Sequence, residues 1–239
     1  LIVTKYQTHA CASRVRAYFA GGEGSSDTSG IDTVTIASTG NATDYGDLTN
    51  ARSHCRGVSS STRGVAGGGH PGSSPNISNI MDFISLISAG DATDFGDLIT
   101  AMRSMSNASS STRALIMGGN RMPTNAPFND GNDGNNTICT IEIATIGNAI
   151  DFGDLSARRG YPGACGDPVR MVIFGGYNNA VGSPLGLKTS DTVIYASHGN
   201  GVDFGEASHG GSNKAASNST RGIWGGTSGG SNTYTNIMY

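Results

Sequence analysis

Short segments in which apolar and polar residues alternate recur along the chain, and each ends just before a glycine. They read DTVTIAS at 32–38, DFISLIS at 82–88, TIEIAT at 140–145 and DTVIYAS at 191–197. Alternation with a period of two, with β-branched residues at many of these positions, is typical of a half-buried β-strand. No apolar pattern with a helical period of useful length occurs, so we expect an all-β chain.

A second landmark precedes each alternating segment and consists of an arginine, a short apolar run and two glycines. Its five copies are RAYFAGG at 16–22, RGVAGG at 63–68, RALIMGG at 113–119, RMVIFGG at 170–176 and RGIWGG at 221–226. Each copy predicts a further strand that ends at the glycines, and a loop of variable length follows it.

A nine-residue motif completes the repeat. It reads GNATDYGDL at 40–48, GDATDFGDL at 90–98, GNAIDFGDL at 147–155 and GNGVDFGEA at 199–207, and its first glycines are 50, 57 and 52 residues apart. A short strand at this motif and a serine-rich return give about four strands per unit, which is the size of one β-propeller blade. A β-solenoid is the rival fold, but its coils are usually much shorter.

The order of these elements resembles the kelch repeat. Arginine, an apolar strand, Gly-Gly, a variable loop, an alternating strand and an aromatic-x-x-Leu segment lead to Ala51-Arg52 and Ala157-Arg158, with Met102-Arg103 in the second unit. Phe or Tyr stands where kelch usually has Trp, and a Tyr follows Gly-Gly only at Tyr177. The combination of a GNATDFGDL-type motif with STRG also resembles repetitive propeller-like proteins of marine phages and environmental sequences. These resemblances imply a fold more strongly than an activity.

The two ends of the chain set the expected number of blades. Leu1 to Lys5 aligns with Leu48 to Arg52, and Asn236 to Met238 aligns with Asn79 to Met81. We therefore expect a single domain over 1–239, a five-bladed propeller with one blade shared between the two termini, roughly residues 1–22 plus 221–239. Closure would remove exposed sheet edges. A fragment of a larger propeller is the alternative.

Composition excludes several partner classes. The net charge is −3 and the pI is about 5.9, which gives no basic footprint for nucleic acid. No apolar run is long enough to span a bilayer, and no signal peptide is visible. The four cysteines show no CxxC spacing, so we expect free thiols.

The carboxylates of the nine-residue motif could form a catalytic pair, a turn or a ligand site repeated in each blade. A catalytic pair is needed once, whereas the motif occurs four times in the same phase of the repeat. Asp and Gly are turn formers, which favours a structural role. The carboxylates concerned are Asp44, Asp94, Asp151 and Asp203.

Two sets of cations share the period of the repeat. The first precedes the Gly-Gly strands: Arg16, Arg63, Arg113, Arg170 and Arg221. The second follows the nine-residue motif: Lys5, Arg52, Arg103 and Arg158. We expect them to pair with the repeated carboxylates and to bind turn carbonyls within or between blades. A basic ring that captures an anion is the sharper alternative.

The residues after Gly-Gly differ from unit to unit, and variable loops on a rigid repeat are where binding specificity usually resides. The candidate ligand-binding residues are Glu23, His70, Asn120, Tyr177 and Thr227. The loop FNDGNDGNNT offers Asp130 and Asp133 as weak candidates for Ca²⁺, but it lacks EF-hand spacing. We predict neither a metal nor another cofactor.

The resulting expectation is a non-enzymatic binding or adhesion propeller that recognises a surface glycan or a protein. The phage-like resemblance implies a virion-associated or extracellular host-recognition role. One alternative is a glycan-active or kelch-oxidase-like enzyme with its site at the channel mouth, for which Tyr177, His70 and Cys139 are the asymmetric residues. The other is a structural spacer in a longer fibre.

Overall fold

The computed structural model describes residues 1–72, 77–121, 133–178, 185–207, 210–211, 214–228 and 234–238. All regular secondary-structure elements in these residues are β-strands, which confirms the all-β prediction. The chain divides into two compact units, Leu1–Arg103 with Ile141–Ile150 and Ser104–Thr140 with Asp151–Tyr239.

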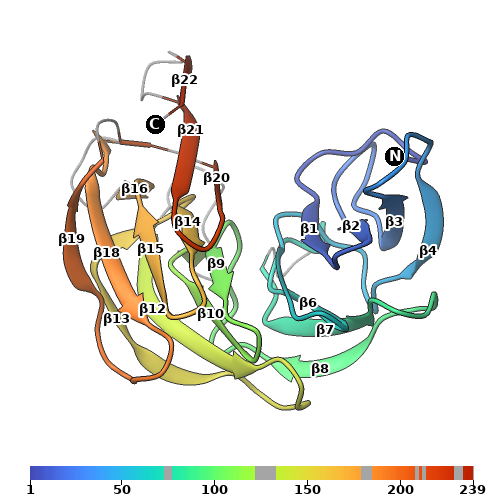
Figure 1. Ribbon diagram of the computed structural model, residues 1–239, viewed down its shortest axis with the longest axis horizontal. Helices are drawn as coiled ribbons and strands as arrows, with labels where there is room; N and C mark the ends of the chain where they lie inside the picture. Colours follow the sequence, from blue (N-terminus) through green and yellow to red (C-terminus); the bar gives the residue numbers. More distant parts are fainter. Residues whose placement is uncertain are drawn as a thin grey trace. The chain divides into compact units, whose positions relative to one another are not determined.

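The first unit contains two four-stranded antiparallel sheets, each with its strands in chain order (Figure 1). One is β1 (His9–Ala12), β2 (Arg16–Ala20), β3 (Gly30–Thr35) and β4 (Thr43–Asp47). The other is β5 (Arg56–Ser59), β6 (Arg63–Gly67), β7 (Ile80–Ser85) and β8 (Thr93–Asp97). The Gly-Gly strand is second, the alternating strand third and the nine-residue motif fourth in each sheet.

The second unit repeats this plan. One sheet runs β9 (Ser106–Ser109), β10 (Arg113–Met117), β12 (Asp133–Glu142) and β13 (Ile150–Arg159), with β11 (Asn120–Arg121) paired to β12. The next runs β14 (Gly163–Gly166), β15 (Arg170–Phe174), β18 (Thr189–Ile194) and β19 (Val202–Glu206). A three-stranded sheet follows, β20 (Lys214–Ser217), β21 (Gly222–Ser228) and β22 (Tyr234–Met238), and β16 (Tyr177–Asn178) pairs with β17 (Leu185–Gly186).

Four successive four-stranded meanders are the building plan of propeller blades, so the fold is β-propeller-like. The fifth repeat forms a sheet of three strands, because a nine-residue motif follows only the first four alternating strands. Five complete blades are therefore not present in the described residues.

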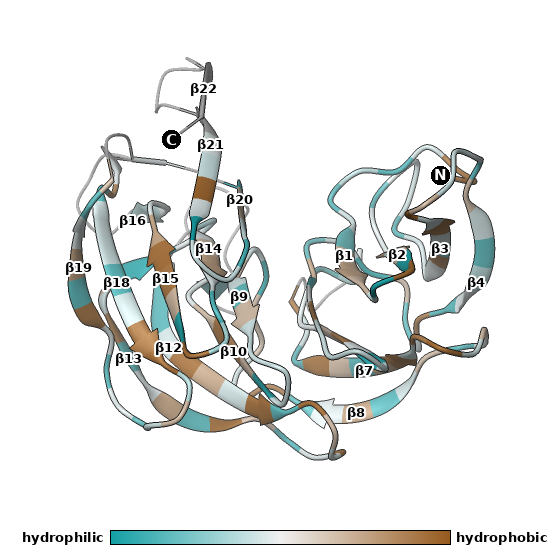
Figure 2. Cartoon of the chain, in the orientation of Figure 1, coloured by the Kyte–Doolittle hydropathy of each residue, from teal (hydrophilic) through white to brown (hydrophobic). Residues whose placement is uncertain are grey.

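Apolar residues of the alternating and Gly-Gly strands form the cores, as the brown bands on β7 and β15 show (Figure 2). In the first unit Tyr18, Ile31, Tyr45, Ile84 and Leu86 belong to one buried cluster. The rings of Tyr18 and Tyr45 meet edge to face with centroids 4.8 Å apart. The aromatic residue of the motif thus packs between its own sheet and the next, which is why it recurs in every copy.

Backbone hydrogen bonds join the motif of one sheet to the motif of the next. The amide of Gly90 donates to the carbonyl oxygen of Tyr45 at 2.9 Å, and the amide of Ala92 donates to that of Asp47 at 2.7 Å. The side chain of Asp91 accepts a hydrogen bond from the Asp47 amide at 3.0 Å. We call this three-residue junction the motif latch: the opening Gly-Asx-Ala turn satisfies the free edge of the preceding motif strand.

The latch occurs at two further junctions with the same geometry. The amides of Gly147 and Gly199 donate to the carbonyl oxygens of Phe95 and Phe152 at 2.8 Å. The side chains of Asn148 and Asn200 accept from the amides of Asp97 and Asp154 at 3.0 Å. Each internal copy of the motif is therefore both donor and acceptor, so one nine-residue sequence serves both roles.

Candidate functional site

The first carboxylates of the motif lie at the surface. Asp44, Asp94, Asp151 and Asp203 are all exposed. Asp94 accepts a hydrogen bond from the Gly96 amide at 3.3 Å, and Asp203 accepts one from the Gly205 amide at 3.0 Å. These are contacts to the backbone two residues on, the geometry of an Asx turn.

The arginines before the Gly-Gly strands reach backbone carbonyls rather than these carboxylates. Arg63 donates to the carbonyl oxygen of Ile143 at 3.2 Å and stacks over the Phe83 ring at 4.5 Å. Arg113 donates to the carbonyl oxygen of Tyr195 at 2.7 Å. Both acceptors lie four residues before a motif glycine in the following repeat. Arg16, Arg170 and Arg221 are exposed.

A different set of carboxylates forms buried ion pairs with the second set of cations. Arg52 Nη2 lies 2.8 Å from Asp82 Oδ2, and neither side chain is exposed. Lys5 Nζ lies 3.3 Å from Asp32 Oδ2. In both cases a register shift in the alternating strand falls at the aspartate. A bulge of this kind re-aims a side chain, here toward the cation.

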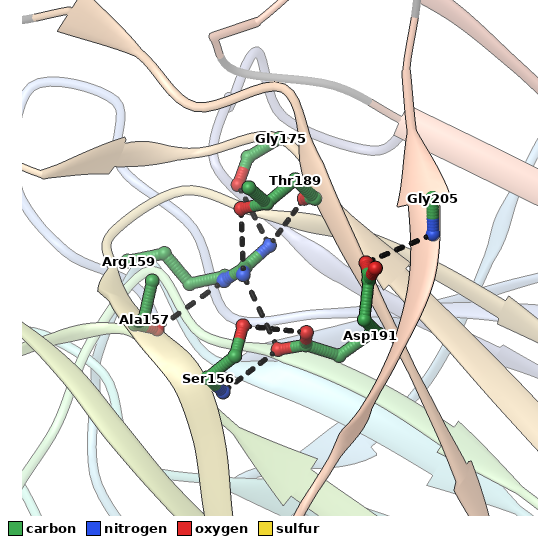
Figure 3. Close-up of polar contacts among 8 residues, drawn as sticks. Ser156, Ala157, Arg159, Gly175, Thr189, Asp191 and Gly205 are labelled. Carbon is green, nitrogen blue, oxygen red and sulfur yellow. Dashed lines mark hydrogen bonds and ion pairs between the residues drawn. The ribbon is translucent and has the colours of Figure 1, made fainter.

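The third buried pair is the most fully bonded (Figure 3). Arg159 Nη2 lies 3.3 Å from Asp191 Oδ2, and Arg159 Nη1 donates to the carbonyl oxygen of Thr189 at 2.9 Å. Ser156 donates to Asp191 from its hydroxyl at 2.6 Å and from its amide at 3.0 Å. Burial lowers the pKa of the Arg159 guanidinium, and the Asp191 charge opposes that shift. These contacts hold the strands together.

In two repeats the residue at this cation position is not the one expected from the sequence. The residue four positions after the last motif residue in its first complete copy is Arg52, and its counterparts are Met102 and Arg159. Arg158, singled out from the sequence, is exposed, whereas Arg159 is buried. Where Met102 replaces the cation, Cys139 occupies the aspartate position of the alternating strand that follows. Cation and carboxylate are thus replaced together.

The residue after Gly-Gly forms the same two-way backbone bridge in several repeats. Glu23 exchanges amide and carbonyl hydrogen bonds with Tyr6, at 2.8 Å in both directions. His70 exchanges them with Ser53, and Tyr177 with Gly160. The partner always follows the cation position directly. The backbone carries this junction, so the side chain at the Gly-Gly position is free to vary.

In the first unit these loops bring five polar and aromatic residues into a continuous chain of contacts. Tyr6 is bridged to Glu23, and Glu23 is bridged to Asp27. Asp27 Oδ2 lies 3.3 Å from His70 Nδ1. The His70 ring meets the His54 ring edge to face, with centroids 6.5 Å apart. We call these five residues the first-unit loop surface.

The electrostatics of the first-unit loop surface are acidic at its Tyr6 end. A side-chain hydrogen bond to Glu23 is the main cause that raises the pKa of Tyr6, which is 56% exposed. Burial lowers the pKa of His54 to about 4, and the charge of Arg103 adds to this effect. His54 is therefore neutral at physiological pH. The surface offers hydrogen-bond acceptors beside an accessible aromatic ring.

Sequence reasoning identified Glu23 and His70 of this surface and missed the other three. Tyr6 and His54 follow the cation position by one and two residues, so their fixed phase in the repeat could have indicated them. His54 has φ 55°, and the equivalent Gln7, Ser104 and Tyr161 have φ 53–55°. Asp27 lies in a loop whose length differs between repeats, and no pattern in the sequence places it.

The remaining candidates are separate from this surface. Asn120 is buried at 1% exposure in β11. Thr227 lies in β21 opposite Thr235, and its side chain is not among those described. Asp130 lies outside the described residues, and Asp133 is the first residue of β12. Within the described ranges, no group of three or more His, Cys, Asp or Glu side chains is arranged to hold a metal ion.

All four cysteines are free thiols, as predicted, and Cys139 is buried in β12. Across the described part of the chain, no helix is long and apolar enough to cross a membrane.

Comparisons with known proteins return no match for this chain, either among protein-family models or among curated proteins. The resemblance to kelch and phage repeats therefore rests on the sequence motifs alone.

Proposed function

We propose that this protein is a non-catalytic binding module built on a five-bladed β-propeller, and that it recognises a surface glycan or a protein carrying one. The first-unit loop surface is the binding site. A virion-associated or extracellular host-recognition role is the setting in which such a module would act.

The observation that carries this proposal is the backbone bridge after Gly-Gly. The bridge is the same at Glu23, His70 and Tyr177, yet the three side chains differ in charge and size. A structural role would fix the side chain, as it does for the buried aspartates. A position whose backbone is fixed and whose side chain varies is suited to presenting ligand contacts.

The chemistry of the first-unit loop surface favours a polyhydroxylated ligand. Glu23 provides carboxylate oxygens that accept hydrogen bonds from hydroxyl groups, whereas the Asp27 side chain is 6% exposed and contacts His70. Tyr6 provides an accessible aromatic face, on which the apolar face of a sugar ring can pack. Neutral His54 and His70, whose Nδ1 lies 3.3 Å from Asp27 Oδ2, form the far end of the surface.

Support for five-bladed closure comes from the N-terminal segment. The amide of Ile2 donates to Asp32 Oδ2 at 3.3 Å, and the amide of Thr49 donates to Asp82 Oδ2 at 3.3 Å. Leu1–Lys5 thus contacts the first sheet as the segment after a motif contacts the following sheet. The fifth sheet pairs Gly225 with Met238 in the register of Gly67 with Met81.

A glycan array probed with labelled protein tests the proposal. We expect binding to a restricted set of glycans, lost in the double variant Tyr6→Ala, Glu23→Gln. Arg158→Ala, an exposed position outside the surface, is the matched control and should bind as the unaltered protein does. An array without signal, or binding that the double variant retains, would contradict the proposal. Turnover of a bound glycan would contradict its non-catalytic part.

A further inference from the structure

The fourth motif differs from the other three because its latch is unfilled. Phe204 and Glu206 occupy the positions whose backbone groups accept the turn of the following repeat elsewhere. No such hydrogen bond is formed by either residue within the described part of the chain. At Gly96 an added Cβ would lie 2.6 Å from the Gly147 carbonyl oxygen, whereas at Gly205 no atom of the described residues lies within 4 Å.

The motif aromatic of the fourth repeat is uncovered for the same reason. Tyr45, Phe95 and Phe152 are at most 3% exposed, whereas Phe204 is 53% exposed. In the first sheet, Leu86 of the following repeat and the latch residue Ala92 help to cover Tyr45. A half-exposed phenylalanine on a sheet edge whose three equivalents are buried indicates a missing partner.

Arg170 lies beside this open latch and is available to a bound segment. Its equivalents Arg63 and Arg113 donate to a carbonyl oxygen of the following repeat, whereas Arg16 is exposed although the next repeat follows it. The Arg170 side chain is instead 56% exposed, and its nearest carboxylate oxygen, on Asp167, is 3.9 Å away. A cavity of about 140 Å³ lies here, lined by Arg170, Phe204 and Arg221 among others.

β22 is an edge strand of the fifth sheet among the described strands. β22 pairs with β21 and with no other strand among those described. In the second sheet the corresponding strand β7 also pairs with a motif strand, with Ile80 opposite Asp97 and Met81 opposite Gly96. The edge of β22 and the latch of β19 thus correspond to the two places where a motif strand and its turn bind elsewhere in the chain.

We propose that this edge of the second unit binds an extended polypeptide segment that carries the sequence of the repeat itself. The segment contains the end of an alternating strand, a Gly-Asx-Ala turn and an Asp-aromatic-Gly-Asp strand. Its turn latches onto β19, its motif strand pairs with β22, and a carbonyl oxygen four residues before the turn accepts a hydrogen bond from Arg170. The mode is β-strand addition at a sheet edge.

Residues 82–98 of this chain provide the probe, because they contain each of these elements in the register of the second repeat. A synthetic peptide with this sequence, labelled at its N-terminus, is titrated into the full chain. We expect saturable one-to-one binding. A peptide of scrambled sequence should not bind, and equal binding of the two peptides, or no binding of either at millimolar concentration, would overturn the proposal.

Arg170→Ala and Arg16→Ala form a matched pair, since both arginines are exposed and occupy the same position of the repeat. The loss of one hydrogen bond from a charged donor should weaken peptide binding about tenfold in the Arg170 variant. The Arg16 variant should bind as the unaltered chain does. Equal affinities of the two variants would refute the assigned edge.

Hydrogen exchange on the unaltered chain locates the bound peptide without any variant. The Glu206 amide is the counterpart of the Asp47 amide, which already donates to Asp91. Peptide binding should therefore slow exchange at Glu206 and leave Asp47 unchanged. Protection elsewhere with none at Glu206 would show that the peptide binds another surface.

Discussion

Replacement of Asp82 by Asn tests whether the buried ion pairs hold the repeats together. Arg52 and Asp82 are fully buried and 2.8 Å apart, so the substitution leaves the guanidinium without its counter-charge. Breaking a buried pair from one side costs about 3–5 kcal/mol. Against a total stability of about 5–15 kcal/mol for a folded domain, this is a large fraction. Arg52→Met should be comparably destabilising, because it leaves the buried Asp82 carboxylate without a counter-charge.

The chain itself suggests the compensating change. Where the cation position holds Met102, the aspartate position holds Cys139, so one repeat dispenses with both charges. The double variant Arg52→Met, Asp82→Cys copies that solution. Uncharged side chains of similar volume can replace a buried pair at little cost. We expect the double variant to lose less than about 2 kcal/mol, so the coupling energy exceeds the effect of either single change.

Urea unfolding of the four proteins in this cycle, followed by tryptophan fluorescence and circular dichroism, measures the coupling. With a slope of about 3 kcal/mol per molar urea, each single variant should shift the midpoint by roughly 1–1.7 M. Arg158→Met, a change to an exposed arginine, is the control and should shift it little. Additive single effects in the double variant would refute the reasoning, because independent sites add and coupled ones do not.

Three further predictions concern the latch and a buried histidine. Gly96→Ala should destabilise the protein in urea unfolding by several kcal/mol more than Gly205→Ala. The two glycines have similar backbone angles, φ 130° and 122°, but only Gly96 faces a carbonyl oxygen. Equal losses of stability in the two variants would contradict the latch. Asn148→Ala should cost about 1 kcal/mol through the lost bond to the Asp97 amide, and Asn41→Ala, without that bond, should cost close to none. Burial lowers the pKa of His9 to about 3, so the unfolded chain binds a proton that the folded chain does not between roughly pH 6.5 and 3. The free energy of unfolding should therefore decrease as the pH is lowered through this window, by up to about 1.4 kcal/mol per pH unit. His9→Leu should reduce this slope.

The sequence predicted the strands and their order because the relevant signals are local and repeated. Alternation at 82–88 indicated β7, and the paired glycines marked the end of β6. The latch was not predicted, although all of its residues belong to the quoted motif. Its bonds run between copies about 50 residues apart, and a pattern within one copy does not show which backbone groups meet.

The ion pairs show where a repeat alignment goes wrong. The expected carboxylates were those of the nine-residue motif, such as Asp94, whereas Arg52 pairs with Asp82 on the alternating strand. Asp82 was visible in the sequence but had no reason to point inward until the bulge beside it was known. For the candidate site, Glu23 and His70 were found by phase, whereas Asp27 is positioned by a loop that the repeat does not describe.

The placement of variable residues follows from how the repeat is held together. A motif that is donor at one end and acceptor at the other ties each internal copy to two neighbours, so a change such as Asn148→Ala affects a junction. The buried pairs restrict Asp82 and its equivalents in the same way. After Gly-Gly, in contrast, the backbone alone makes the bridge, as at Glu23 and His70. A chain of this design can diversify its chemistry only there and in the adjoining loops, which is why we propose the ligand site on the loop surface rather than on the motif.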